Sequence, residues 1–267
     1  AIADVNNLLA GVTFNPTQHY NNNFSINTSV SDGIAAPITG IKNMTGSAVN
    51  DAPTATNLSI AESYTEDTAL NLMNIVTNDV DNATLTATLT LSDSNAGSLS
   101  VGTSGSVTST YANGIWISGG AIADVNNLLA NVIFTPTLNY NNNFSIATNI
   151  SDGIAPAIVG NKTFSDIAVN EAPIGNNISV AETYTANNPL NLVDMVITDV
   201  DSTDVTVTLT RSDINACTLN TETIGSVTST FMNGISTSTG NINIINQLLQ
   251  NIVFTPADSY TDNFNIA

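Results

Sequence analysis

The sequence predicts an all-β protein made of tandem β-sandwich modules of about 120 residues, each with one short helix. Three observations support this fold class: a long internal repeat, segments in which apolar and polar residues alternate, and Asn-Gly turn signals between such segments. Together they favour a chain of whole repeated domains.

The repeat has a constant period of 120 residues. The segment AIADVNNLLA occupies Ala1–Ala10 and recurs unchanged at Ala121–Ala130, and a diverged third copy begins at Asn241. This period exceeds the roughly 20–50 residues of a solenoid repeat and fits a whole β-sandwich domain of about 100 residues. The constant offset predicts one rigid module per repeat, joined by short linkers.

The module boundaries are predicted at Asn50–Pro53 and Asn170–Pro173, because proline holds the preceding residue extended and cannot donate to a ladder. On this phase, residues 1–50 are the C-terminal part of a first β-sandwich module. Residues 51–170 are a complete module, and residues 171–267 are a second module without its last strand. Since Ala1–Ala10 recurs inside the chain, we expect the sequence to belong to a longer protein whose targeting signals lie elsewhere.

The strands are predicted from period-two patterns. Thr84–Leu91 reads TLTATLTL, which is the alternation of a half-buried strand, and Val205–Leu209 repeats it. Asn113-Gly114 lies between two further apolar runs, and Asn-Gly in that position is a strong hairpin signal. Trp116, on the second arm of this hairpin, is expected in the core.

One segment of each repeat has helical spacing instead. Ile122, Val125, Leu128 and Leu129 recur three and four residues apart, and the copies that begin near Ile2 and Ile242 keep the pattern. We expect a helix of about two turns that packs its apolar face on the sandwich.

The composition excludes several functions. Hydrophobic residues make up 42% of the chain, so a packed core is expected, whereas 22 acidic residues face only 3 basic ones and give a formal charge of −19. Such a chain repels nucleic acid and anionic membranes, and no apolar run is long enough for membrane insertion. Self-repulsion favours a neutralising cation, and a divalent metal is the simplest candidate.

Catalysis has little support. The chain has one histidine, His19, whose counterparts in the other repeats are Asn139 and Ser259, and no hydrolase or phosphate-binding motif is present. Cys217 is the only cysteine, which excludes an intrachain disulfide and a thiolate zinc site, and we expect it to be a small buried apolar residue. The chain is therefore predicted not to be an enzyme.

Oxygen ligands recur where metal binding would need them. Asp79 and Asp81 form an Asp-x-Asp pair, and residues i and i+2 of an extended segment point to the same side. Calcium prefers six to eight oxygen ligands of carboxylate and carbonyl type, although acidic linkers can also merely keep turns solvated. The candidate ligands are Asn50, Asp51, Glu66, Asp67, Asp79, Asp81, Asn170, Glu171, Asp199 and Asp201.

The ordered series of motifs resembles a known family over essentially the whole chain. VNDAPTATNLSIAESYTEDTALNL, IVTNDVD, TATLTLSDSNAGSL, YANGIWISGGAIADVNNLLANVIFTP and NYNNNFSIATNISDG follow one another at fixed spacing. This series is similar to the cadherin-like (Ig-like) repeats in the extender regions of large bacterial RTX-type adhesins, which are secreted by the type I route. The resemblance implies β-sandwiches strung end to end on the bacterial cell surface, with Ca²⁺ at the joints.

The resemblance also implies roles for individual residues. At the first joint, Asn50 and Asp51 would be linker ligands, Glu66 an acid from an early strand, and Asp79 with Asp81 the paired carboxylates. The second joint would use Asn170, Glu171, Asp199 and Asp201. It departs from the pattern because Ala186-Asn187 replaces Glu66-Asp67, so fewer or weaker calcium ions are expected there. Asp32 and Asp152, in Ser-Asp-Gly turns, are lower-grade candidates.

We therefore expect structural extender repeats of a secreted adhesin, with roles in cell adhesion and biofilms. The partners are neighbouring repeats, and a host or biofilm ligand would be bound through other domains. One alternative is a module that grips a glycan or protein through the loops at residues 95–103 and 215–223, which differ between copies. Another is a surface-layer or filament subunit assembled by strand exchange between chains.

Overall fold

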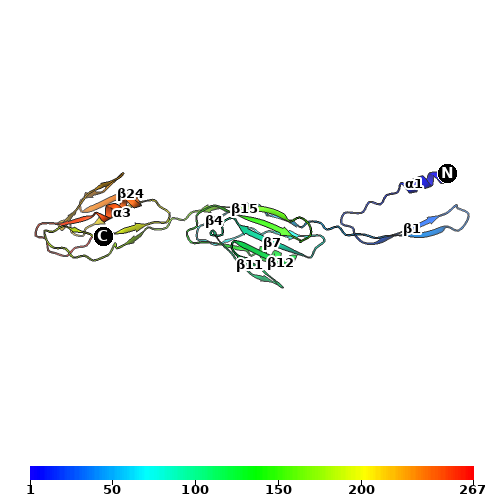
Figure 1. Cartoon of the computed structure of the whole chain (residues 1–267), viewed down its shortest axis with the longest axis horizontal. Helices are drawn as coiled ribbons and strands as arrows, with labels where there is room; N and C mark the ends of the chain where they lie inside the picture. Colours follow the sequence, from blue (N-terminus) through cyan, green and yellow to red (C-terminus); the bar gives the residue numbers. More distant parts are fainter. The chain divides into compact units, whose positions relative to one another are not determined.

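The computed structural model describes residues 1–267 and divides into two compact units, Ala1–Ala168 and Val169–Ala267 (Figure 1). The unit boundary falls beside the Asn170–Pro173 linker. No helix in the structure has the length and apolar character needed to cross a membrane.

The first unit contains a six-stranded sheet in the order β11-β12-β7-β14-β15-β4. All neighbours are antiparallel except β15 and β4, which run parallel. The parallel pair joins residues about 100 positions apart in the sequence. The strands are β11 (Thr110–Ala112), β12 (Ile115–Ala121), β7 (Thr84–Leu91), β14 (Phe144–Ser151), β15 (Ile158–Ile167) and β4 (Glu62–Thr65).

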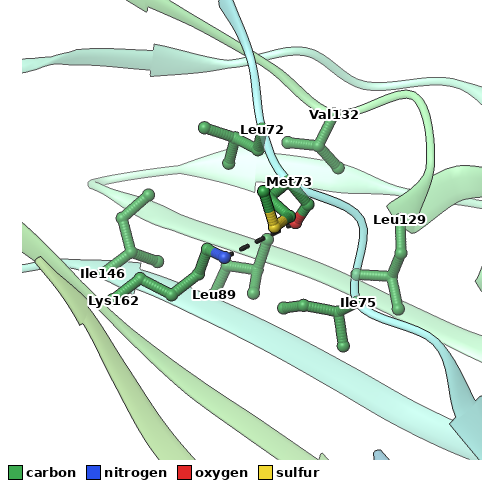
Figure 2. Close-up of a pocket in the computed structure, with 8 residues that line it drawn as sticks. All are labelled: Leu72, Met73, Ile75, Leu89, Leu129, Val132, Ile146 and Lys162. Carbon is green, nitrogen blue, oxygen red and sulfur yellow. Dashed lines mark hydrogen bonds between the residues drawn. The ribbon is translucent and has the colours of Figure 1, made fainter. Parts of the chain in front are cut away.

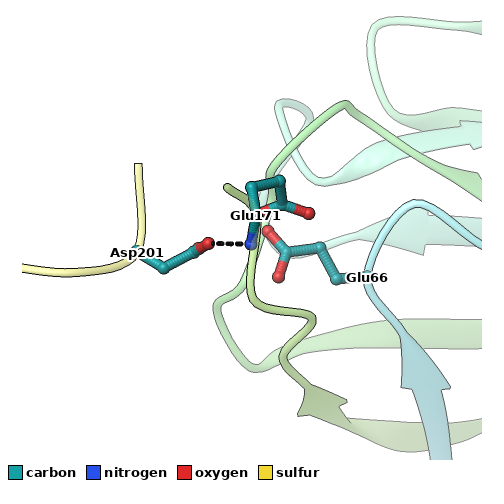
Figure 3. Close-up of side chains that lie close together, drawn as sticks. All are labelled: Glu66, Glu171 and Asp201. Atoms are coloured by element: carbon teal, nitrogen blue, oxygen red, sulfur yellow. Dashed lines mark hydrogen bonds between the residues drawn. The ribbon is translucent and has the colours of Figure 1, made fainter. Parts of the chain in front are cut away.

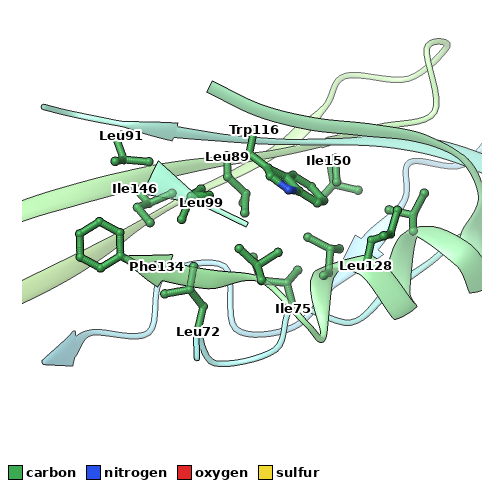
Figure 4. Close-up of a cluster of buried hydrophobic side chains, with 14 of the residues drawn as sticks. Leu72, Ile75, Leu89, Leu91, Leu99, Trp116, Leu128, Phe134, Ile146 and Ile150 are labelled. Carbon is green, nitrogen blue, oxygen red and sulfur yellow. The ribbon is translucent and has the colours of Figure 1, made fainter. Parts of the chain in front are cut away.

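A second sheet, β5-β13-β8, packs over the first, and the apolar side chains of both form one core (Figure 4). Trp116 from β12 and Phe134 from β13 are fully buried there, which confirms the expected core position of the tryptophan. Two short ladders, β3-β6 and β9-β10, complete an all-β sandwich and confirm the predicted fold class. The strands are β5 (Leu70–Asn71), β13 (Ile133–Pro136), β8 (Gly97–Leu99), β3 (Thr54–Ala55), β6 (Thr77–Asn78), β9 (Thr103–Ser104) and β10 (Val107–Thr108).

The local patterns form as predicted. In β7 every second side chain is buried, beginning at Leu85, because successive residues of a strand face opposite sides of the sheet. Asn113 and Gly114 have φ angles of 52° and 79° and close the β11–β12 hairpin. Two positive φ values define a type I′ turn, which Asn and Gly tolerate best.

The predicted helix is α2 (Ile122–Leu129), and its apolar face buries Val125, Leu128 and Leu129 in the core. Asn126 anchors it to β6, since its side-chain oxygen accepts hydrogen bonds from the Thr77 N–H and hydroxyl, at 2.8 Å each. Its amide donates to the Thr77 carbonyl at 2.9 Å. The helix therefore covers part of the sandwich core and shields it from solvent.

The first 50 residues repeat the elements that end the complete module. They contain α1 (Ile2–Ala10) and a hairpin of β1 (Phe24–Val30) with β2 (Ile38–Met44). Most of their apolar side chains are exposed, and α1 has no buried residue.

The second unit repeats many elements of the complete module at the same 120-residue offset, including α3 (Ile242–Gln250), but it has no strands equivalent to β4, β14 and β15. Its main sheet has three strands, β19-β24-β23, and its second sheet is β17-β25-β20. Cys217 lies buried in the core, as expected, and burial raises the pKa of its thiol. The strands are β16 (Ile174–Asn176), β17 (Leu190–Asn191), β18 (Val196–Thr198), β19 (Asp204–Thr210), β20 (Cys217–Leu219), β21 (Thr223–Ile224), β22 (Val227–Thr228), β23 (Thr230–Met232), β24 (Ile235–Asn241) and β25 (Val253–Pro256).

Candidate metal centre

In the structure, the Asp-x-Asp pair of Asp79 and Asp81 lies next to the first linker and holds it through a hydrogen bond. The backbone N–H of Asp51 donates a 2.7 Å hydrogen bond to Oδ2 of Asp81. Oδ1 of Asp79 accepts from the backbone N–H groups of Asp81 and Asn82, at 2.8 Å each. This local turn fixes the aspartates, because a side-chain oxygen that caps two N–H groups restrains its own backbone.

The other oxygen of Asp79 is the most informative atom of this cluster. Oδ2 is buried and has no hydrogen-bond partner in the protein. A carboxylate oxygen removed from water without a partner costs free energy, and a bound cation offsets that cost. Its position next to Asp81 and the linker makes this the best candidate ligand in the first unit.

Two further residues complete the cluster. Asp152 was only a lower-grade candidate in the sequence, and Asn82 was not a candidate. Asn50 donates its amide to Oδ2 of Asp152 at 2.7 Å, across 102 residues of sequence. Asn82 donates to Oδ1 of Asn50 at 2.7 Å and to the same Asp152 oxygen at 3.3 Å. The Asn50 amide, followed by the backbone N–H of Ile154, lowers the pKa of the Asp152 carboxyl and keeps it charged.

Asn82 could have been found from its place directly after the Asp-x-Asp pair. Asp152 had only the Ser-Asp-Gly turn as a signal, and that turn also occurs at Asp32, where the carboxylate caps Ile34 and Ala35 without contacting a linker. The backbone N–H groups of Ala35 and Ile34 likewise lower the pKa of Asp32. His19, which was not expected to be catalytic, lies 2.8 Å from Oδ2 of Asp51 through Nδ1.

Glu66 and Asp67 lie at the other end of the first unit. The backbone N–H of Glu66 donates to the carbonyl of Ile167, the last residue of β15. Phe144, at the start of β14, pairs with Phe164 near that end, whereas Asp152 follows the opposite end of β14. At about 3.4 Å per residue, the eight residues of β14 separate the two ends by roughly 25 Å or more.

The expected grouping of Glu66 with the first linker therefore does not match the register of the sheet. The parallel pairing of β4 with β15 carries Glu66 to the end from which the chain leaves the unit. The Glu66 side chain is fully buried. Oδ1 of Asp67 accepts a hydrogen bond from the backbone N–H of Asn139 at 2.8 Å, so this carboxylate stabilises a turn.

The linker of the second unit repeats the backbone contacts of the first, and Figure 3 shows one of them, between Glu171 and Asp201. Glu171 donates its backbone N–H to Oδ2 of Asp201 at 2.7 Å. Oδ1 of Asp199 accepts from the N–H groups of Asp201 and Ser202, at 2.9 and 2.7 Å. The amide of Asn170 donates to the Glu171 carbonyl at 2.8 Å. Oδ1 of Asp201 is buried without a hydrogen-bond partner, as Oδ2 of Asp79 is in the first unit.

Apart from His19, which contacts Asp51 at the first linker, the groups that could bind a metal in both clusters are carboxylates and amide or backbone carbonyls. Such an all-oxygen set fits a hard cation, and its variable geometry suits Ca²⁺ better than the strict octahedron that Mg²⁺ demands. The absence of histidine and thiolate side chains from the candidate ligands disfavours Zn²⁺.

An apolar pocket lies beside the core, and the side chain of Lys162 is part of its lining (Figure 2). This charged side chain makes the pocket a poor second ligand site. Lys162 is 1% exposed, and its ammonium lies 2.8 Å from Oε1 of Glu62. It also donates to the backbone carbonyls of Asn57 and Met73, at 3.2 and 3.5 Å. This buried ion pair ties β15 to β4, the parallel neighbour that carries Glu66 to its position.

No protein-family model matches the chain, and no curated protein is significantly similar to it. Solved structures of cadherin extracellular domains are similar to it at low identity. Human CDH23 EC21–23 is 13% identical with a TM-score of 0.37, over 91% of this chain and 66% of that one. Protocadherin gamma C5 EC1–3 is 12% identical with a TM-score of 0.36, over 97% and 72%. Protocadherin gamma B2 cadherin domains 3–6 are 13% identical with a TM-score of 0.33, and the chain spans only 52% of their length.

Proposed function

We propose that the chain is a set of structural extender repeats from an extracellular bacterial adhesin, whose linkers bind Ca²⁺ and become stiff. The observation that carries this proposal is the Asp51–Asp81 contact beside the buried, unpartnered Oδ2 of Asp79. A cation at that oxygen would fix the linker to the Asp-x-Asp turn. A related arrangement at the second linker, where Glu171 contacts Asp201 and the unpartnered oxygen is Oδ1 of Asp201 itself, supports a second site.

The charge of the chain supports the same proposal. At −19, a compact acidic protein repels itself, and each bound Ca²⁺ removes two charges where carboxylates gather. Extracellular calcium modules bind at about 10⁻⁴–10⁻³ M, so the linkers would be occupied outside cells and empty in the cytosol. A flexible state inside and a stiff state outside suit a secreted extender.

In this proposal the repeats themselves are not catalytic, and they act on their neighbours in the chain. A host or biofilm ligand would be bound by other domains of the parent protein. The acidic surface excludes nucleic acid as a partner, because such binding needs basic groups that displace counterions.

The test is a calcium titration of the full chain, followed by thermal unfolding and small-angle scattering. Calcium at ten times its dissociation constant stabilises the folded state by about 1.4 kcal/mol, which corresponds to a rise of about 3–11 °C in Tm. We also expect a larger and narrower distribution of end-to-end distances. The control is the double variant Asp79→Asn and Asp199→Asn, which keeps the turn-capping oxygens and removes two carboxylates.

Two outcomes would contradict the proposal. One is a Tm and scattering curve that EDTA leaves unchanged in the native chain. The other is a calcium response that the double variant keeps in full, because binding would then lie away from the linkers.

A further inference from the structure

Both lysines of this protein stand at the same position of the repeat. The chain has three basic residues, and two of them, Lys42 and Lys162, lie 120 residues apart. The glutamate that pairs with Lys162 recurs as well, because Glu182 lies 120 residues after Glu62. Lysine is ordinarily a surface residue, yet Lys162 is almost completely buried. Solubility therefore does not explain this lysine, and its contacts indicate another role.

The side chain of Lys162 joins β15 to three places in the first part of the module (Figure 2). Its ammonium lies 2.8 Å from Oε1 of Glu62 in β4. It donates to the backbone carbonyl of Asn57, which precedes β4, at 3.2 Å, and to that of Met73, which follows β5, at 3.5 Å. Oε2 of Glu62 in turn accepts the backbone N–H of Met73 at 2.9 Å. One buried lysine thus holds the last strand of the module against the segments that begin it.

The residues before Lys162 contact the same early segment. The backbone N–H of Asn161 donates to Oγ of Ser59 at 3.2 Å. Gly160 lies so close to Leu58 that a Cβ atom at this glycine would be 2.5 Å from the Leu58 carbonyl oxygen. A residue with a side chain would push the two segments apart, so the glycine permits the close approach on which the lysine contacts depend.

Beyond Lys162, β15 and β4 pair in parallel, and this direction decides how they respond to tension. Phe164–Ile167 pairs with Glu62–Thr65. The first linker precedes β4 and the second follows β15, so tension along the chain draws the two strands in opposite directions along their length. Their hydrogen bonds then carry the load together, whereas a hairpin pulled from its open end separates one bond at a time. We call residues 57–66 and 160–167 the β4–β15 clamp.

We propose that the β4–β15 clamp carries tension through the module, and that Lys162 sets the force at which the module unfolds. This inference deepens the proposed function, because an extender between a cell and a bound surface is under tension. Sliding the strands by one residue, about 3.3 Å, would draw the Lys162 ammonium away from Glu62 while both are still buried. Separated buried charges are costly, whereas apolar contacts can be exchanged along a strand at lower cost. The ion pair therefore opposes the first step of sliding.

The test is single-molecule force spectroscopy of the full chain, held by its two ends, in EDTA. Lys162→Met removes the ammonium and keeps a long side chain. Forced unfolding is governed by the unfolding rate, so this rate is measured at constant force and, without force, in denaturant. We expect the variant to raise the rate under force on the order of 10-fold more than the rate in denaturant, because only force loads the clamp lengthwise. Residues 51–170 release a longer chain than residues 171–267, which identifies the event.

Two further variants separate load bearing from ordinary stability. Lys162→Met combined with Glu62→Gln leaves no buried carboxylate without its cation, and the glutamine oxygen can still accept the Met73 N–H, so this chain should fold and keep the excess sensitivity to force. Lys42→Met removes the same charge from an exposed side chain at the equivalent position of the repeat, and it should change neither rate. Since EDTA removes calcium, these outcomes are independent of metal binding at the linkers.

Three results would overturn the proposal. If the Lys162 variants raise both rates by the same factor, the lysine contributes to stability and does not bear load. If they leave the rate under force unchanged, the clamp does not depend on the ion pair. If Lys42→Met raises the rate under force as much as Lys162→Met does, the effect comes from net charge.

Discussion

The two linkers share one backbone frame and differ in the side chains around it. In both, a linker N–H donates to the second aspartate, Asp81 or Asp201, at 2.7 Å. In both, the first aspartate caps the turn. The next residue differs, since Asn82 bridges Asn50 and Asp152 at the first linker, whereas Ser202 takes its place at the second.

This difference separates two tasks of the acidic cluster. The invariant contacts fix the linker to the Asp-x-Asp turn and need only backbone N–H groups and carboxylates. The amide of Asn82 adds side-chain cross-links, which hold Asn50 beside the carboxylate of Asp152. We therefore expect the first linker to be the stiffer of the two before any cation binds.

The largest effect is expected from the shared frame. Asp81→Ala removes the acceptor of the Asp51 N–H and one carboxylate of the proposed site. It should raise the calcium dissociation constant of the first linker on the order of 10-fold or more, because calcium affinity depends on the number of charged ligands. Isothermal titration on the full chain measures this.

The matched variant is Asp201→Ala, which should weaken the second linker alone. If either change weakens both linkers equally, or neither, the two clusters are not separate sites.

A smaller effect is expected where the linkers differ. Asn82→Ser copies the second linker into the first and loses the two hydrogen bonds of the amide. Since a hydrogen bond contributes about 0.5–1.5 kcal/mol, we expect a loss of about 1–2 kcal/mol in the free energy of unfolding, measured with denaturant in EDTA. Ser202→Ala is the control and should be nearly neutral. A neutral Asn82→Ser would mean that the amide bridges do not stabilise the linker.

Much of the fold follows from local sequence. The alternation in Thr84–Leu91 and the Asn113-Gly114 turn specify their elements through side-chain period and backbone freedom, which neighbouring residues alone decide. The approach of the linker to the Asp-x-Asp pair was also expected, because Asp79 and Asp81 recur as Asp199 and Asp201 and an acidic residue, Asp51 or Glu171, stands in each linker.

The rest of the site depends on pairing between distant strands. Asp152 meets Asn50 only because β14 runs antiparallel to β7 in a particular register, and Glu66 reaches the far end only because β4 joins β15 in parallel. Neither register can be predicted from a local sequence pattern, since strands that alternate regularly can pair in several ways. Sequence therefore identifies the ligand types and leaves their grouping open.

A pH titration should distinguish the linkers further. The Asn50 amide lowers the pKa of Asp152, so the folded state binds this proton less readily than the unfolded chain. The stabilisation is fully present above the unfolded pKa of about 3.9 and is lost as pH falls through the lower folded pKa. The carboxyl resonance of Asp152 in NMR should titrate below that of a model peptide. Asn50→Ala should move it back toward the ordinary value, and an unchanged titration would exclude the amide as the cause.

The smallest effect is expected at the turn residue Asp67. Its oxygen accepts the Asn139 N–H at 2.8 Å, and Asn187 in the second unit accepts the Ser259 N–H at 3.1 Å with an amide oxygen. Both residues have positive φ angles, of 57° and 64°, which Asp and Asn tolerate. Asp67→Asn should therefore change the free energy of unfolding by less than about 0.5 kcal/mol in EDTA, whereas Asp67→Ala should cost about 1 kcal/mol. The unfolding of both variants should then be measured again in calcium. If Asp67→Asn weakens the stabilisation by calcium, the carboxylate of Asp67 is part of a metal site; if it does not, Asp67 acts only in the turn.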